Sequence, residues 1–311
     1  MSLVFQSILI ISCMIIIGAI LTKTFSFNEY TRKMFISLIV NVAMPCIILS
    51  SIFHVEMNAG TFRLIAIVFG LSIVINLVGI GVGWGFAQLF HGTSTKKREL
   101  ALLSGLGNTG FIGIPLCATI IGPEGGLFAA IFDAGVDFTI WTVGVIILQK
   151  EKRITLGTLK SMVNIPTAAI VAGLFIAFYQ VKTPEIVIRL TDQLADLAAP
   201  LAMFYIGALI MTLKRDKVRE TGQESWIPIV VKLIFMPLLV ASLLPYFSLK
   251  MEIAQTILIQ SMMPTLTLAS ILFAKYSADE EMGTLTTVLS TIISVITIPL
   301  MFFLVHFFGA F

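Results

Sequence analysis

Two acidic residues stand four positions apart in an otherwise apolar stretch of this sequence. Asp133 and Asp137 belong to the run Ile131-Phe-Asp-Ala-Gly-Val-Asp137, and their spacing places both on one face of a helix. A carboxylate inside a membrane is costly and usually faces a cavity or a partner. The pair therefore predicts a site for a coupling proton or sodium ion. The alternative is a structural pair that is hydrogen-bonded to open backbone.

A glycine-rich run interrupts another apolar segment. Gly105-Leu-Gly-Asn-Thr-Gly-Phe-Ile-Gly-Ile-Pro115 is a poor sequence for a continuous helix. Open backbone is tolerated at membrane depth only where protein or a water-filled cavity covers it. The run thus predicts a buried binding site, as in many secondary transporters. The candidate residues of this site are Gly107, Asn108, Thr109, Gly110 and Pro115.

Among the prolines inside apolar segments are Pro45, Pro115, Pro200 and Pro264, and each removes the hydrogen bond to the carbonyl four residues earlier. Pro115 and Pro264 can also begin a new half-helix, whose N-terminus attracts anions. The alternative is that these prolines only kink helices. The further candidates for the binding site are Asn41, Pro45, Gln260, Pro264 and Thr265, and Asp196, which precedes Pro200 by four positions, is a candidate charge.

Lys232 lies inside an apolar segment, about a turn and a half from its cytoplasmic end. It either extends to the membrane surface or points inward, towards the freed carbonyls or a substrate carboxylate. Asn76 is a weaker candidate, for a hydrogen bond between helices. The three cysteines and three histidines have no metal-ligand spacing, and the cysteines are expected to be small buried apolar residues.

The composition is that of a multi-pass membrane protein. Apolar residues make up 58% of the 311 residues and charged residues only 12%, against about 25% in a soluble domain. The mean hydropathy is +1.02. The first apolar run lacks a preceding Lys or Arg, so we expect a retained helix and not a cleaved signal peptide.

Ten apolar segments are predicted to be transmembrane helices. They are residues 3–22, 30–53, 62–90, 99–121, 124–148, 165–181, 188–213, 227–247, 253–275 and 283–308. Most of the 20 basic residues lie in the loops after the odd-numbered spans, which predicts that both termini are extracytoplasmic.

The two halves of the chain share a pattern. Asn41…Pro45 in span 2 matches Asp196…Pro200 in span 7, and Pro115 in span 4 matches Pro264 in span 9. Five spans in each half give the halves opposite orientation, so we predict an inverted repeat. The predicted division is residues 1–148, a cytoplasmic connector at 149–164, and residues 165–311.

The order of these features resembles the auxin efflux carrier family in its bacterial branch, the malonate and malate permeases. The matching residues are Gly107-Asn108-Thr-Gly110-Phe-Ile-Gly113-Ile-Pro115, Asn41…Pro45, Lys232 with Pro237, and Met262-Met-Pro264. The chain lacks the long central loop of plant members and has Gln260, Ser261 and Thr265 where a second Asn would be expected.

The resemblance implies an all-α fold in which spans 4 and 9 cross as broken helices. Spans 1, 2, 6 and 7 would form a dimerising scaffold, and spans 3–5 and 8–10 a transport domain with elevator-type motion. It implies an organic anion bound at the crossover, with Asn108 as its polar anchor. The expected partners are this anion, the lipid bilayer and a second copy of the chain, with no nucleic acid.

We therefore predict a plasma-membrane secondary transporter of a small organic anion, which is not an enzyme and needs no cofactor beyond a coupling proton or sodium ion. One alternative is a sodium-coupled carrier of the bile acid symporter type. Another is an intramembrane aspartyl protease, although Asp133 and Asp137 share one helix and no Gly-x-Gly-Asp motif is present. The last is a receptor that does not transport.

Overall fold

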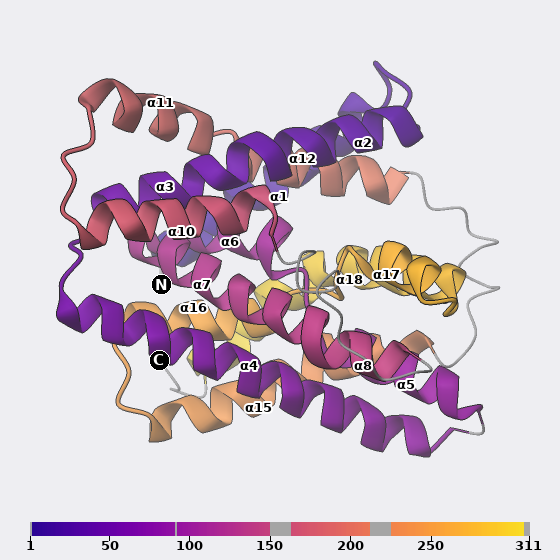
Figure 1. The fold of residues 1–311 in the computed structure, drawn as a ribbon. Helices are drawn as coiled ribbons and strands as arrows, with labels where there is room; N and C mark the ends of the chain where they lie inside the picture. Colours follow the sequence, from indigo (N-terminus) through magenta and orange to yellow (C-terminus); the bar gives the residue numbers. More distant parts are fainter. Residues whose placement is uncertain (1, 91, 150–162, 212–224, 308–311) are drawn as a thin grey trace. The chain divides into compact units, whose positions relative to one another are not determined.

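A computed structural model describes residues 2–90, 92–149, 163–211 and 225–307. Most of the predicted connector, at 150–162, lies outside these ranges, as do the basic residues at 214–219 and the C-terminal residues 308–311. The described residues contain helices and no strand (Figure 1).

The helices follow one another with short connections. Up to residue 149 they are α1 (Ser2–Leu21), α2 (Glu29–Leu38), η1 (Ile39–Ala43), α3 (Met44–His54), α4 (Ala59–Gln88), α5 (Ser94–Gly105), η2 (Thr109–Gly113), α6 (Ile114–Ile121), α7 (Pro123–Thr139), η3 (Ile140–Gly144) and α8 (Val145–Leu148). From residue 163 they are α10 (Ile165–Phe178), α11 (Glu185–Ala195), α12 (Ala198–Met211), α14 (Trp226–Val230), η5 (Val231–Phe235), α15 (Met236–Leu243), η6 (Leu244–Tyr246), α16 (Met251–Ser261), α17 (Ala269–Lys275) and α18 (Glu280–Phe307).

Many of these helices are apolar on their outer faces. In the described residues, six continuous helical runs, most of which join several of these elements, are long and apolar enough to cross a membrane. Three shorter apolar runs lie at Leu9–Leu21, Thr109–Ile121 and Ile165–Phe178. Large apolar side chains are exposed along them, for example Ile16 at 57% and Ile296 at 72%. A helix satisfies its own backbone hydrogen bonds, so such segments are stable in hydrocarbon. The chain is a multi-pass membrane protein.

Three π-helical turns in the described residues precede a proline. The turns η1, η2 and η5 each lead into a helix whose second residue is Pro45, Pro115 or Pro237. A proline ring clashes with the carbonyl four residues earlier, and a π-turn widens the helix at that point. The helical path therefore continues past these prolines instead of stopping at them.

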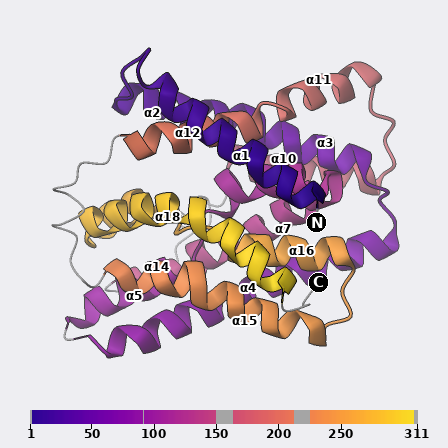
Figure 2. The same ribbon diagram turned by 180° about the vertical axis from the view of Figure 1, so that it is seen from behind.

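The chain divides into two compact units. The first consists of Met1–Val68, Gly110–Asp133 and Val163–Leu213. In it α1 packs along α12, and α3 contacts both α10 and α11 (Figure 2). Glycines allow α1 and α12 to lie very close together. A Cβ on Gly18 or on Gly207 would strike the backbone of the other helix.

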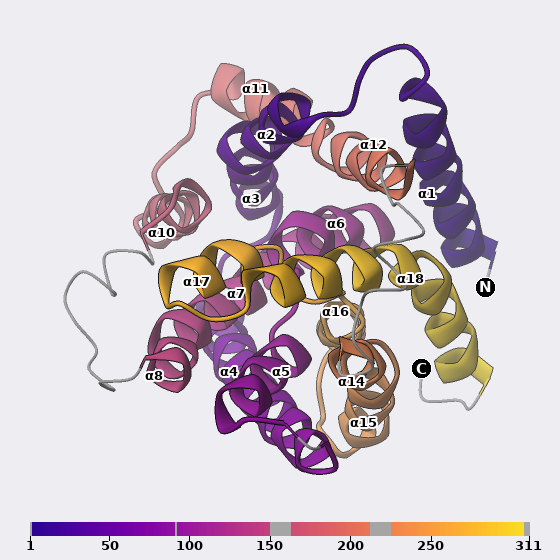
Figure 3. The ribbon, with the colours of Figure 1, turned by 90° about the vertical axis from the view of Figure 1, so that its right-hand side faces the viewer.

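The second unit consists of Phe69–Thr109, Ala134–Met162 and Lys214–Phe311. Its long helix α18 packs against α17, α14 and η5, and α14 also contacts α5 (Figure 3). The buried polar side chains of α18 are small hydroxyls, among them those of Thr286, Thr287, Ser290, Thr291 and Ser294. The buried face of this helix is therefore lined with hydroxyl groups.

Candidate functional site

Two unwound segments of the second unit pair with each other. One follows α5 and the other follows α16, and they form an antiparallel bridge between Gly107 and Thr265. The Asn108 backbone N–H donates to the Pro264 carbonyl at 2.7 Å, and the Leu266 N–H donates to the Leu106 carbonyl at 3.2 Å. Each segment thus satisfies backbone groups that the other has left open, which is what unwound chain requires at membrane depth.

Close packing explains the glycine at the end of α5. A Cβ on Gly105 would lie 2.5 Å from the backbone nitrogen of Ile80 and 2.9 Å from the carbonyl oxygen of Asn76, both on α4. Only glycine permits this approach of two backbones. The Asn76 side chain donates to the Ser72 carbonyl at 2.7 Å, so it bonds within its own helix and not to another as predicted.

Lys232 points inward and does not extend to the membrane surface. It belongs to η5, and only 3% of it is exposed. A Cβ on Gly107 would lie 2.8 Å from Cε and 3.0 Å from Nζ of Lys232. Within the described part of the chain, the ammonium group forms no hydrogen bond and no ion pair with a carboxylate. The structure thus places the amine of a buried lysine beside the bridge, with no carboxylate partner in the described residues.

Asn108 presents a second polar group without a partner. Its backbone joins the bridge, but its side-chain amide makes no hydrogen bond to any described residue, although only 7% of Asn108 is exposed. A buried amide normally has hydrogen-bond partners. Since Asn108 follows Gly107 directly, the bridge brings an ammonium group and an amide into the same neighbourhood. Both groups suit the recognition of a carboxylate.

Hydroxyl groups of α18 hold the second unwound segment in place. Ser290 Oγ accepts the Thr265 N–H at 3.1 Å and lies 2.8 Å from Thr265 Oγ1. Thr287 Oγ1 donates to the Leu266 carbonyl at 3.0 Å. Neither Ser290 nor Thr287 was predicted from the sequence. Their signal was the series of Ser and Thr residues at helical spacing in the last span.

The prediction that Pro264 begins a half-helix is wrong, whereas Pro115 is the second residue of the α-helix α6, which continues from a π-turn. The first half-helix begins at Thr109, six residues before Pro115, as the π-turn η2. The second begins at Ala269, and Pro264 lies in the unwound segment before it. The glycines and the pairing with the other segment set the point of unwinding in the first case, and Pro115 is accommodated by the π-turn.

In the first unit, Asp133 lies against the start of the half-helix. A Cβ on Gly110 would be 2.6 Å from one oxygen of the Asp133 carboxylate and 3.0 Å from the other. Gly110 is the second residue of η2, so a carboxylate of α7 occupies the N-terminal turn of this half-helix. A negative charge is favoured there. Asp137 lies one turn further along α7 and is half-buried, like Asp133.

The remaining predicted residues are more scattered. Asn41 is exposed in η1 and donates to Ser37 Oγ at 3.0 Å, and Asp196 is exposed at the turn between α11 and α12. Gln260 and Thr265 are fully buried near the bridge, and Thr109 is buried at its edge. Pro45 is buried as the second residue of α3.

The cysteines differ in exposure and form no metal centre. Cys117 is buried as expected, Cys46 is half-buried, and Cys13 is exposed on α1. Among the described residues, no group of three His, Cys, Asp or Glu side chains could hold a metal ion.

Comparison with known proteins places the chain among transporters and not among enzymes. A family model described as "Membrane transport protein", that of the auxin efflux carriers, matches residues 3–157 and 153–302. An uncharacterised transporter of Methanothermobacter thermautotrophicus is 23% identical over 95% of this chain and 96% of its own. An uncharacterised transporter of Methanocaldococcus jannaschii is 22% identical over 94% of this chain and 96% of its own.

A third relative, from Rhizobium meliloti, has a name that proposes a malonate transporter. It is 25% identical to this chain over 79% of this chain and 74% of its own. The family model covers nearly the whole sequence, including both unwound segments and Lys232. The chain therefore belongs to the auxin efflux carrier family of membrane transport proteins.

Proposed function

We propose that this protein is a secondary active transporter of a small organic anion. The substrate class is a mono- or dicarboxylate such as malonate or malate, or an auxin-like acid. The observation that carries the proposal is the Lys232 ammonium, buried beside the Gly107–Thr265 bridge without a carboxylate partner in the described residues. A buried charge is costly unless it is paired, and a bound anion would pair it.

The substrate would bind through two groups of the second unit. Lys232 would neutralise one carboxylate, and the Asn108 amide would donate to a carboxylate oxygen. An ammonium group is a point charge without directional preference, whereas the amide is directional. The lysine would thus supply affinity for anions in general, and Asn108 would orient the substrate.

We further propose that transport follows the family's elevator-type alternating access. In this proposal ten spans form two inverted repeats, and spans 4 and 9 cross as broken helices. The backbone pairing between 106–108 and 264–266 supports the crossing. Spans 1, 2, 6 and 7 would be the scaffold of a homodimer in the plasma membrane, with Asn41 and Pro45 on its substrate-facing side and the Asp196 charge close by.

Uptake of radiolabelled malonate and malate into proteoliposomes tests the binding site. Removing one partner of a buried charge pair costs about 2–5 kcal/mol, so Lys232→Met should weaken apparent affinity by about 30-fold or more. Asn108→Ala should also reduce uptake, because it removes the amide that would bind the substrate. The bridge itself should remain, because only the Asn108 backbone takes part in it. Lys182→Met is the matched control, since Lys182 is exposed between α10 and α11.

Each variant needs a folding check by size-exclusion chromatography and thermal unfolding. Folded Lys232→Met or Asn108→Ala protein with undiminished uptake of every acid tested would refute the site. Equal losses in Lys182→Met would show that the effect comes from net charge and not from the bridge.

We propose Asp133 as the coupling site, with Asp137 as its partner on the same face of α7. A proton or sodium ion bound at Asp133 would neutralise the charge that occupies the first turn of the half-helix, two residues from Asn108. Asp133→Asn and Asp137→Asn should remove the dependence of uptake on a pH or sodium gradient. Unchanged gradient dependence in both variants would exclude this role. Gradients of each ion imposed separately distinguish a proton-coupled carrier from the sodium-coupled type.

A further inference from the structure

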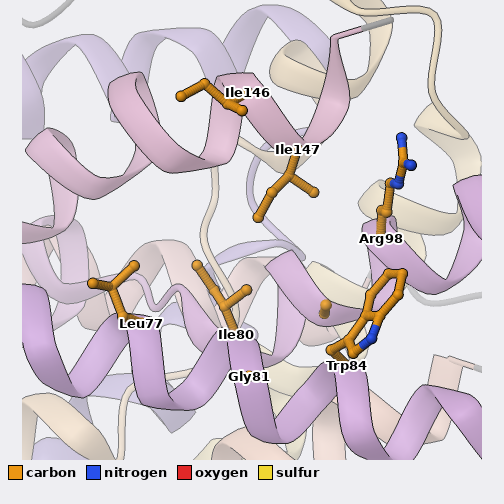
Figure 4. Close-up of a pocket in the computed structure, with 8 residues that line it drawn as sticks. Leu77, Ile80, Gly81, Trp84, Arg98, Ile146 and Ile147 are labelled. Atoms are coloured by element: carbon orange, nitrogen blue, oxygen red, sulfur yellow. The ribbon is translucent and has the colours of Figure 1, made fainter. Parts of the chain in front are cut away.

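The second unit contains a pocket that the proposed transport site does not use. It has a volume of about 430 Å³ and lies between α4, α5 and α8 (Figure 4). Figure 4 shows Leu77, Ile80 and Trp84 of α4 on one side and Ile146 and Ile147 of α8 on the other. The lining residues are Leu77, Ile80, Gly81, Trp84, Arg98, Ala101, Ile146 and Ile147.

The pocket is apolar along its length and basic at one end. Arg98 is its charged residue, and Figure 4 shows the Arg98 and Trp84 side chains together at the end opposite Leu77. In the described part of the chain, Arg98 forms no ion pair and no hydrogen bond through its side chain. The neighbouring Lys97 is directed elsewhere and donates to Gln88 Oε1 at 3.1 Å.

The positive-inside rule assigns the basic end of the pocket to the cytoplasmic side of the membrane. Trp84 is one turn before the end of α4 at Gln88, and the following loop leads to Lys96, Lys97 and Arg98, a cluster that the positive-inside rule assigns to the cytoplasm. Leu77 lies seven residues earlier, about 10 Å deeper along the helix. Tryptophan at this depth is typical of a membrane interface.

We propose that this pocket binds an anionic phospholipid of the cytoplasmic leaflet. The Arg98 guanidinium would pair with the lipid phosphate, and the Trp84 indole N–H would donate to the headgroup or ester region. One acyl chain would lie on Leu77, Ile80 and Ile147. The charge of Arg98 complements the negative headgroup, and basic pockets between transmembrane helices on this side suit such lipids. The apolar lining of Leu77, Ile80, Ile146 and Ile147 favours an occupant with an acyl chain over free inorganic phosphate.

Gly81 offers a way to fill the pocket without altering its charge. A Cβ on Gly81 would meet no atom within 4 Å, although Gly81 lines the pocket. Gly81→Leu should therefore fold normally and occupy the space of the acyl chain. Gly85 lies one turn further along α4, has the same open surroundings and does not line the pocket. Gly85→Leu is thus a matched control.

Thermal unfolding of the purified protein in detergent, with added lipid, tests the proposal. Phosphatidylglycerol should raise the unfolding temperature of the wild type and of Gly85→Leu, whereas phosphatidylcholine and inorganic phosphate should not. Gly81→Leu and Arg98→Ala should lose most of this rise, with apparent affinity lower by about fivefold or more for Arg98→Ala. Mass spectrometry should detect more co-purified phosphatidylglycerol with the wild type and Gly85→Leu than with Gly81→Leu and Arg98→Ala.

Three results would overturn the proposal. An equal response of all four proteins to phosphatidylglycerol would place the lipid elsewhere. A rise produced equally well by inorganic phosphate would indicate a site for a free anion. A change of oligomeric state in Gly81→Leu, with no change in lipid response, would assign this face to contact between copies of the chain. If Arg98→Ala does not fold, the Gly81→Leu and Gly85→Leu pair alone decides the outcome.

Discussion

Lys232 and Asp133 show how single side chains are positioned by glycines. The Lys232 ammonium lies against Gly107, and the Asp133 carboxylate lies against Gly110, at distances that leave no room for a Cβ. The glycine-rich run therefore does more than weaken a helix. It allows two charged side chains from other helices to approach the backbone at membrane depth, where charges are otherwise costly.

Gly107→Ala tests this positioning. The added Cβ would lie 2.8 Å from Lys232 Cε, so the lysine must move away from the bridge. The far end of a lysine side chain is flexible, so the variant should fold, but the displaced ammonium group should weaken the apparent affinity for the anion, measured as a higher KM of uptake. Gly85→Ala, where a Cβ meets open space, should leave the KM unchanged. An unaltered KM in Gly107→Ala would separate Lys232 from substrate binding.

At the scale of elements, the helices meet through small residues and hydroxyl groups. Within the first unit, Gly207 of α12 allows α1 to approach so closely that any side chain would strike the backbone at Ile15 and Ala19. Within the second, α18 holds the unwound segment through Ser290 and Thr287. Close contact between small residues and hydrogen bonds between helices are the interactions that remain effective in lipid.

Gly207→Ala should destabilise the protein because neither backbone can move without separating α1 from α12. We expect a loss of about 1–3 kcal/mol, seen as a lower unfolding temperature in detergent. Gly70→Ala is the control, because a Cβ there meets nothing within 4 Å. It should be neutral or stabilising by up to about 1 kcal/mol, as expected for Ala against Gly in a helix. Equal unfolding temperatures for both variants would contradict the close contact.

Ser290→Ala should loosen the second unwound segment. It removes the acceptor of the buried Thr265 N–H, which costs about 1–3 kcal/mol. Hydrogen exchange measured by mass spectrometry should then be faster in peptides covering 262–268. Ser294→Ala is the matched control, since Ser294 is buried on the same helix but donates only to the Thr291 carbonyl. Similar exchange in both variants would mean that the Ser290 bond does not hold this segment.

At the scale of the whole molecule, the distribution of charge along the chain predicts its orientation in the membrane. Basic residues gather in alternate loops, and apolar side chains cover the outer faces of the helices. The positive-inside rule then assigns the loop at 22–28 to the cytoplasm and the loop at 179–184 to the other side.

Cysteine labelling tests this orientation. In a variant without the native Cys13, Cys46 and Cys117, a membrane-impermeant maleimide should label Lys182→Cys on intact cells. Thr24→Cys should react only after the cells are permeabilised, because both positions are exposed but lie on opposite sides. The reverse pattern would invert the predicted topology and move the phospholipid pocket to the outer leaflet.

The sequence by itself determined the class of the protein and predicted where its site lies. The apolar composition, the glycine-rich run and the acidic pair within an apolar segment predicted a transporter, because open backbone and charge inside membrane helices are costly and usually functional. It also identified Lys232 and Asn108, but it left the direction of the lysine undecided and placed the start of each half-helix at a proline.

Only the tertiary structure decided which groups meet. Whether Lys232 points inward depends on the rotation of its helix, which is set by packing against segments far away in the sequence. The start of the first half-helix follows the pairing between 106–108 and 264–266, and the role of Ser290 is recognisable only once α18 lies beside the second segment. Local spacing specifies helices and their breaks, whereas contacts between distant segments depend on the fold as a whole.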